Sequence, residues 1–94
     1  MIKLTIIGAG SAVFTKNIVT DLLSIDAFKK MNIALMDIDE RRLKYSHDLL
    51  NIIADKLNAK PIIQSYTDIK ESLKGADFVQ STIQVGGYKP STII

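Results

Sequence analysis

The passage from a short apolar run into a pair of glycines constrains this chain more than any other feature. Residues 2–7 are mostly apolar and lead directly into Gly8 and Gly10. Such a run is typical of a strand buried on both faces of a parallel sheet. Behind the glycines, apolar residues recur at helical spacing and predict a helix over residues 12–24. A strand, a tight turn and a helix in this order indicate a fold in which strands and helices alternate.

The alternation continues along the rest of the chain. Pro61 is expected to end the longest helix, because proline lacks an N–H group and its ring clashes with the preceding turn. Strands joined through helices run parallel, and each crossover should be right-handed. The sequence therefore predicts an α/β fold, a Rossmann-like doubly wound parallel sheet truncated after its fourth strand, as one domain over residues 1–94. The expected strands are 2–7, 31–37, 61–67 and 76–85, and the expected helices are 12–24, 39–59 and 69–75.

Composition excludes several classes of function. The net charge is +2, with acidic and basic residues interspersed, so no basic stripe points to nucleic acid. No apolar run approaches the ~20 residues of a membrane span, and the first run is too short and too interrupted for a signal peptide. The chain has no cysteine, which excludes disulfides and thiolate metal sites within it. We expect a cytoplasmic protein with no nucleic-acid or membrane partner.

The glycine turn has the features of a phosphate-binding loop. Gly8 permits a sharp turn out of the strand, and Gly10 has no side chain, so a pyrophosphate can approach the backbone. The N–H groups at the start of the following helix should point outward, where the helix dipole also favours an anion. Ser11 is expected to cap that helix with its side chain. A plain tight turn is the alternative. The residues assigned to the loop are Gly8, Gly10, Ser11, Ala12, Val13 and Phe14.

Val13 stands where the usual G-x-G-x-x-G pattern has its third glycine. That glycine normally serves the close packing of helix against strand and does not touch the phosphate. We therefore expect Val13 to move the helix slightly away from the strand and to leave phosphate binding possible.

Asp37 ends the second expected strand. Its distance in sequence from the third-glycine position is close to the ~20 residues at which an acid binds the adenosine ribose in this fold. A carboxylate accepts hydrogen bonds from both ribose hydroxyls and repels a 2′-phosphate, so Asp37 favours NAD over NADP, and Asp39 adds to that repulsion. The alternative is that both acids are helix caps, and Asp39 is expected to be one.

The end of the fourth expected strand carries the polar residues Ser81, Thr82 and Gln84. In this fold the nicotinamide would lie there, outside the carboxyl ends of the strands. An ordinary exit from strand to loop explains the same composition equally well.

Three other side chains are assigned structural roles. Tyr66 and Phe78 are expected in the core. His47 has no second metal ligand at helical spacing and is expected to be a packing or surface residue.

Three segments together, GAGSAVFTKN, ALMDIDERRL and STIQVGGYKP, resemble glycoside hydrolase family 4 over essentially the whole chain. This family contains NAD- and metal-dependent α-galactosidases, α-glucosidases and α-glucuronidases, and it commonly has phenylalanine where Phe14 stands. The resemblance implies a phosphate loop of Gly8, Gly10, Ser11 and Phe14, with Asp37 on the ribose. It further implies that Thr82, Ile83 and Gln84 line the nicotinamide, and that Gly87 and Tyr88 approach the sugar.

The resemblance also implies the chemistry. The family oxidises the C3 hydroxyl of the sugar by hydride transfer to NAD, a base removes the C2 proton, and a divalent metal, usually Mn²⁺, steadies the enediolate. The leaving group at C1 is then eliminated, water adds, and the hydride returns. The family's metal ligands and base are expected beyond residue 94, so no residue of this chain is predicted to be catalytic or to bind metal. The chain alone is expected to be inactive and to bind NAD weakly at best.

One departure and two alternatives accompany the resemblance. Ser81 stands where many members have asparagine. Lys89 is followed by Pro90, Ser91 and Thr92, which resembles the branch acting on unphosphorylated α-galactosides or α-glucosides. One alternative is a 2-hydroxy-acid dehydrogenase of the lactate or malate type, although those enzymes usually have a different turn after the fourth strand. The other is a non-catalytic module that senses NAD. We expect a homo-oligomer, with exposed apolar surfaces that promote self-association.

Overall fold

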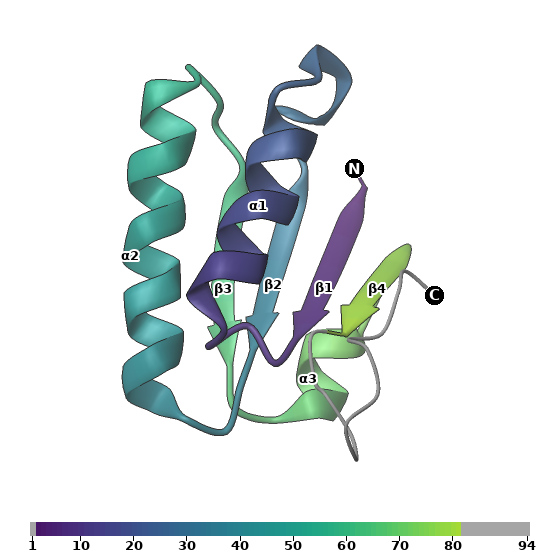
Figure 1. The fold of residues 1–94 in the computed structure, drawn as a ribbon. Coiled ribbons are helices and arrows are strands. Elements are labelled where there is room, and N and C mark those ends of the chain that lie inside the picture. Colours follow the sequence, from purple (N-terminus) through teal and green to yellow (C-terminus); the bar gives the residue numbers. More distant parts are fainter. Residues whose placement is uncertain (1, 82–94) are drawn as a thin grey trace.

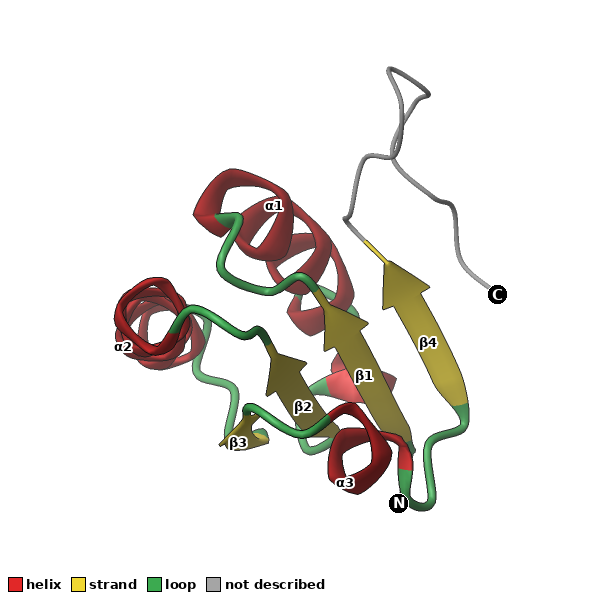
Figure 2. Ribbon diagram, turned by 90° about the horizontal axis from the view of Figure 1, so that it is seen from below, coloured by secondary structure: helices red, strands yellow, loops and turns green. Residues whose placement is uncertain are grey.

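Four parallel strands form one sheet in the computed structural model, which describes residues 2–81, and helices pack on both of its faces (Figures 1 and 2). The strand order is β3-β2-β1-β4. The strands are β1 (Lys3–Ile7), β2 (Asn32–Met36), β3 (Ile62–Tyr66) and β4 (Phe78–Ser81), and the helices are α1 (Ala12–Leu23), α2 (Glu40–Lys56) and α3 (Ile69–Leu73), with a 3-10 turn at Asp26–Phe28. The predicted α/β fold with a doubly wound parallel sheet is confirmed.

The order of the strands decides where the helices lie. The chain moves from β1 through β2 to β3, then returns across the sheet to place β4 on the other side of β1. Because a right-handed crossover changes face when the direction reverses, α1 and α2 cover one face and α3 covers the other (Figure 2). The reversal lies between β1 and β4, which is where folds of this class bind their ligands.

The predicted elements all lie where the sequence pattern puts them within residues 2–81, but their ends differ. The long helix ends at Lys56 and not at residue 59 as predicted, because Asn58 takes a left-handed conformation (φ 53°) and the Ala59 N–H donates to the Ala54 carbonyl. The short turn at Asp26–Phe28 is not in the prediction. The fourth strand begins at Phe78, and the predicted part of it from residue 82 onward lies outside the described residues.

The main core lies between the sheet and the α1–α2 layer. Alternation along β1 and β2 turns Leu4, Ile6, Ile33 and Leu35 toward these helices, while Thr5 and Ala34 face α3. The fully buried side chains of the core include Ile6, Val19, Leu23, Ile33, Leu35 and Leu50.

The prediction that Phe78 lies in the core is wrong. Phe78 is 47% exposed, because it lies on β4 at the edge of the described sheet. Val13 is 70% exposed, because α1 turns Thr15, Val19 and Leu23 to the core and leaves its N-terminal apolar residue outside. Tyr66 is only partly buried.

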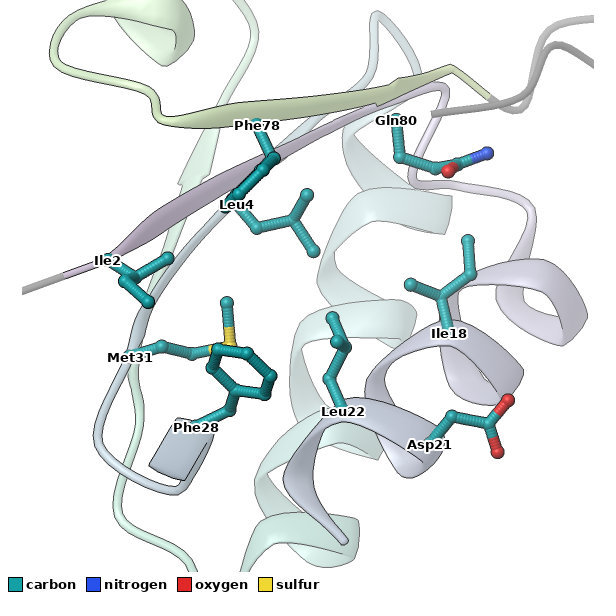
Figure 3. A pocket seen from close by; sticks show the side chains of 9 residues that line it. All are labelled: Ile2, Leu4, Ile18, Asp21, Leu22, Phe28, Met31, Phe78 and Gln80. Carbon is teal, nitrogen blue, oxygen red and sulfur yellow. The ribbon is translucent and has the colours of Figure 1, made fainter. Parts of the chain in front are cut away.

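An apolar groove of about 360 Å³ runs between α1 and the β1–β4 side of the sheet (Figure 3). Asp21 is its only charged lining residue among those described, and its carboxylate points away from the groove. The groove is open because α1 lies over β1 and β2 and leaves β4 uncovered in the described part of the chain (Figure 2). The lining residues are Ile2, Leu4, Ile18, Asp21, Leu22, Phe28, Met31, Phe78 and Gln80.

We propose that this groove promotes self-association of the chain. Contiguous exposed apolar surface is a common cause of association, and burying one phenylalanine contributes about 1.5–3 kcal/mol. Phe78→Lys should therefore weaken the apparent dimer constant by at least about tenfold, measured by sedimentation velocity over a concentration series. Ile52→Lys, on the exposed face of α2, is the control and should leave the constant unchanged. A sedimentation coefficient of the unmodified chain that stays at the monomer value over the whole concentration series contradicts the proposal.

Within residues 2–81, no helix combines the length and the apolar character needed to cross a membrane.

Candidate functional site

The loop after β1 is fastened to the end of β2. Gly8 has a positive φ of 80°, a conformation that favours glycine, and this confirms the sharp turn expected of it. The N–H groups of Gly8 and Ala9 both donate to the Met36 carbonyl at 2.9 Å, and the Ser11 N–H returns to the Gly8 carbonyl at 3.1 Å. The loop is therefore held directly beside Asp37, the residue that follows β2.

The carbonyl oxygen of Ala9 accepts hydrogen bonds from two buried hydroxyl groups. Thr15 Oγ1, from α1, donates to it at 3.0 Å, and Ser46 Oγ, from α2, donates at 2.7 Å. All three residues are buried. The sequence prediction did not include Thr15 or Ser46, although a serine on the buried face of α2, between Leu43 and Leu50, was a signal that could have found one of them.

Asp37 joins the loop to the start of α2. One of its carboxylate oxygens, Oδ2, accepts from the Gly10 N–H at 2.8 Å, and the other, Oδ1, accepts from the Asp39 N–H at 2.9 Å. Each carboxylate oxygen has room for a further hydrogen bond, so the group can still accept ribose hydroxyls. The side chain is partly exposed at the carboxyl edge of the sheet.

The alternative that both acids are helix caps holds for only one of them. Asp39 is the N-cap of α2, and its Oδ1 accepts from the N–H groups of Arg41 and Arg42 at 3.1 Å. Asp37 lies outside the helix and makes none of these capping contacts.

Gly10 is closely surrounded by side chains from beyond the loop. A Cβ atom at this position would lie 2.6 Å from Asp37 Oδ2 and 2.9 Å from Arg42 Cβ. The absence of a side chain at Gly10 is thus required by the approach of Asp37 itself. The sequence had offered only the approach of a pyrophosphate as the reason.

The N-terminus of α1 provides donors at the same edge. No described group accepts a hydrogen bond from the N–H groups of residues 12–14, as expected for the first turn of a helix, and that turn holds no acidic residue. Ser11 takes the N-cap position, but its side chain makes no capping hydrogen bond, so that prediction is wrong. Within residues 2–81 its hydroxyl makes no hydrogen bond.

The helix is not displaced by Val13. Its side chain points to solvent, and the buried residue of this turn is Thr15, whose hydroxyl reaches back to the loop. The expectation that Val13 moves the helix away from the strand is therefore wrong. Phe14, 44% exposed, flanks the loop as well.

Of the polar residues predicted at the end of the fourth strand, Ser81 lies in the described part of the chain. Ser81 pairs with Ile7, so the end of β4 lies beside the start of the loop. The predicted nicotinamide residues Thr82, Ile83 and Gln84 and the predicted sugar residues Gly87 and Tyr88 lie outside the described residues. Residues 2–81 contain no group of three or more His, Cys, Asp or Glu side chains that could hold a metal ion.

Comparisons with known proteins find relatives along the whole chain. The sequence model of the family described as "Family 4 glycosyl hydrolase" matches residues 3–94. The chain is 47% identical over 94 residues to an alpha-galactosidase of Bacillus subtilis (strain 168), covering 100% of this chain and 22% of that protein. It is 35% identical over 87 residues to an alpha-galactosidase of Rhizobium meliloti (strain 1021), covering 93% of this chain and 18% of that protein. The chain thus spans about a fifth of the length of these relatives.

A solved structure has the same fold. It is a 6-phospho-alpha-glucosidase from gut microorganisms, in complex with NAD and Mn²⁺. Its TM-score with this chain is 0.71 at 22% sequence identity, and the match covers 92% of this chain and 20% of that one. The likeness supports the Rossmann-like architecture of the described strands and helices.

Proposed function

The chain belongs to the family 4 glycosyl hydrolases, and from this premise we propose that it is the NAD-binding part of a glycosidase that cleaves α-glycosidic bonds. The proposal takes residues 1–94 as one domain of the parent enzyme. Its support is the family match, the two alpha-galactosidase relatives, and the arrangement of groups at the carboxyl edge of the sheet.

One observation carries the proposal. The glycine turn and the carboxylate of Asp37 meet at the carboxyl edge of the sheet, where hydrogen bonds of 2.8–2.9 Å hold the turn to Asp37 and to the end of β2, and α1 begins directly after the turn. Unpaired N–H groups at a helix N-terminus suit the pyrophosphate, and a carboxylate one strand away suits the adenosine ribose. The residues present therefore fit a dinucleotide.

The loop and Asp37 would bind different parts of the dinucleotide. The loop residues Gly8, Gly10 and Ser11 and the N–H groups of residues 12–14 would bind the pyrophosphate. Asp37 would accept from the ribose hydroxyls and oppose a 2′-phosphate. NAD, when bound, supplies a hydride acceptor for transient oxidation of the sugar at C3. The contacts of Thr82, Ile83 and Gln84 with the nicotinamide and of Gly87 and Tyr88 with the sugar remain predictions.

The substrate and the metal belong to the parent enzyme. We propose an unphosphorylated α-glycoside as substrate, in keeping with the alpha-galactosidase relatives. The Mn²⁺ of the family's chemistry would be held by residues outside this chain. A 2-hydroxy-acid dehydrogenase is not favoured, because the glycosyl hydrolase match extends over residues 3–94. A location in the cytoplasm stays a prediction.

Titration of NADH into the chain, followed by fluorescence, tests the cofactor proposal. Asp37→Ala should weaken NADH binding about 10- to 100-fold, because hydrogen bonds to a charged group contribute ~1.5–3 kcal/mol and 1.4 kcal/mol is a factor of ten. The unmodified chain should bind NADH more tightly than NADPH.

Asp37→Asn provides the matched control for charge. It keeps an oxygen that can accept from a ribose hydroxyl but removes the repulsion of a 2′-phosphate, so the preference for NADH over NADPH should shrink. Equal NADH affinities of the unmodified chain and Asp37→Ala would remove Asp37 from the site. Failure of the unmodified chain to bind NADH would refute cofactor binding by these residues alone.

A further inference from the structure

We infer that Thr15 and Ser46 are positioning residues that set the orientation of Asp37 through the Ala9–Gly10 peptide. The hydrogen-bond chain runs from two buried hydroxyls to a loop carbonyl, and from the N–H of the same peptide to the carboxylate. The effect of this hydrogen-bond chain on the choice between NAD and NADP rests on the proposed function, whereas its effect on the conformation of the loop does not.

The two hydroxyls hold one carbonyl from two different helices. Thr15 Oγ1 lies 3.0 Å from the Ala9 oxygen, and Ser46 Oγ lies 2.7 Å from it. Thr15 and Ser46 are 0% and 1% exposed, so water does not compete for these bonds. A carbonyl oxygen has two lone pairs, and here the two hydroxyls occupy both.

The peptide plane transmits this constraint. In a trans peptide the C=O and N–H groups point in opposite directions and turn together. With the Ala9 carbonyl fixed toward the interior, the Gly10 N–H points outward, where it donates to Asp37 Oδ2 at 2.8 Å. Rotation of this peptide would take the N–H off the carboxylate, whose one other described donor is the Asp39 N–H, on Oδ1.

Packing alone does not call for hydroxyls at these positions. The buried face of α2 also holds Leu43, Leu50 and Ala54, and the buried face of α1 holds Val19 and Leu23. An alanine or a valine would fit such a face without a polar group to satisfy. The hydroxyls of Thr15 and Ser46 each find their acceptor on the loop, which ties the loop to both helices.

The test uses variants that separate the hydroxyl from its volume. Thr15→Val removes the hydroxyl and keeps the shape, Thr15→Ser keeps the hydroxyl, and Ser46→Ala removes the second donor. Ser72→Ala is the matched control, because Ser72 is also 0% exposed and its hydroxyl donates to a backbone carbonyl, that of Ile69 at 2.7 Å, on the opposite face of the sheet.

The first readout needs no cofactor. In amide NMR spectra of the chain, the double variant Thr15→Val/Ser46→Ala should shift the Gly10 resonance and accelerate its hydrogen exchange by about tenfold, the effect of losing roughly one net hydrogen bond. Thr15→Ser and Ser72→Ala should leave the Gly10 amide unchanged. A Gly10 amide that is unchanged in the double variant overturns the inference.

The second readout is the ratio of NADH to NADPH affinity. An Asp37 carboxylate no longer held by the loop can turn away from a 2′-phosphate, so the double variant should lower the ratio several-fold, while Ser72→Ala should preserve it even where it lowers the melting temperature. An unchanged ratio in a double variant that still binds NADH also overturns the inference. If the unmodified chain binds no NADH, the proposed function fails, and the Gly10 amide still decides the role of Thr15 and Ser46.

Discussion

Gly10→Ala is expected to lower the affinity for NADH by about 10- to 100-fold and to destabilise the fold by ~1–3 kcal/mol. The added Cβ would stand 2.6 Å from Asp37 Oδ2 and 2.9 Å from Arg42 Cβ, closer than real Cβ atoms approach other groups. The carboxylate of Asp37 must then move away from the Gly10 N–H. Its two oxygens, which are the proposed acceptors for the ribose hydroxyls, are displaced with it. Fluorescence titration with NADH and urea unfolding measure the two effects.

Gly75→Ala is the matched control for this substitution. Gly75 has a φ of +71°, so alanine is strained there, but a Cβ would meet nothing within 4 Å. Gly10 is not among the described residues with positive φ, so its substitution is dominated by collision. Gly75→Ala should therefore cost about 1–2 kcal/mol of stability and leave NADH binding intact. A Gly10→Ala chain that binds NADH as tightly as the unmodified chain would show that Asp37 is not in contact with the cofactor.

Leu50→Ala is expected to cause the largest loss of stability, about 2–5 kcal/mol. Leu50 is 0% exposed on α2 and belongs to the core between the helices and the sheet. Small domains have total stabilities of ~5–15 kcal/mol, and a chain of this size falls at the low end. The variant should be partly unfolded at 37 °C, which circular dichroism and urea denaturation would show.

Ile52→Ala on the same helix separates burial from helix propensity. Ile52 is 54% exposed, and alanine favours the helix more than isoleucine does, so this substitution should change the free energy of unfolding by no more than about 0.5 kcal/mol. Equal losses in the two variants would mean that α2 is not packed as described.

Most of the fold was predictable because its signals are local. Short apolar runs ending in glycine or aspartate mark the buried parallel strands, and helical spacing marks α1 and α2. The end of α2 was predicted too late, because Pro61 is a conspicuous helix breaker, whereas Asn58 ends the helix through a left-handed conformation that has no unique sequence signature. The exposure of Phe78 was missed because an edge position is a property of the whole sheet.

The candidate site, like the fold, was predictable from the sequence only in part. Gly8 and Asp37 were identified from their spacing, because a turn after one strand and an acid after the next must meet at one edge of a parallel sheet. Thr15 and Ser46 could not be assigned to the loop, because Ser46 reaches Ala9 across 37 positions of sequence. The capping role of Ser11 was predicted wrongly, because a serine at the N-cap position looks the same in the sequence whether or not its side chain accepts a hydrogen bond from the first turn.

The sequence by itself determined the alternation of strands and helices, the glycine turn and the acid opposite it, since each depends on residue types at short and regular spacing. The tertiary structure alone decided that Asp37 approaches Gly10 so closely that no side chain fits there, and that two helices fix one carbonyl of the loop. Those facts depend on distances between segments far apart in the chain, and such distances are set only when the sheet and its helices are packed together.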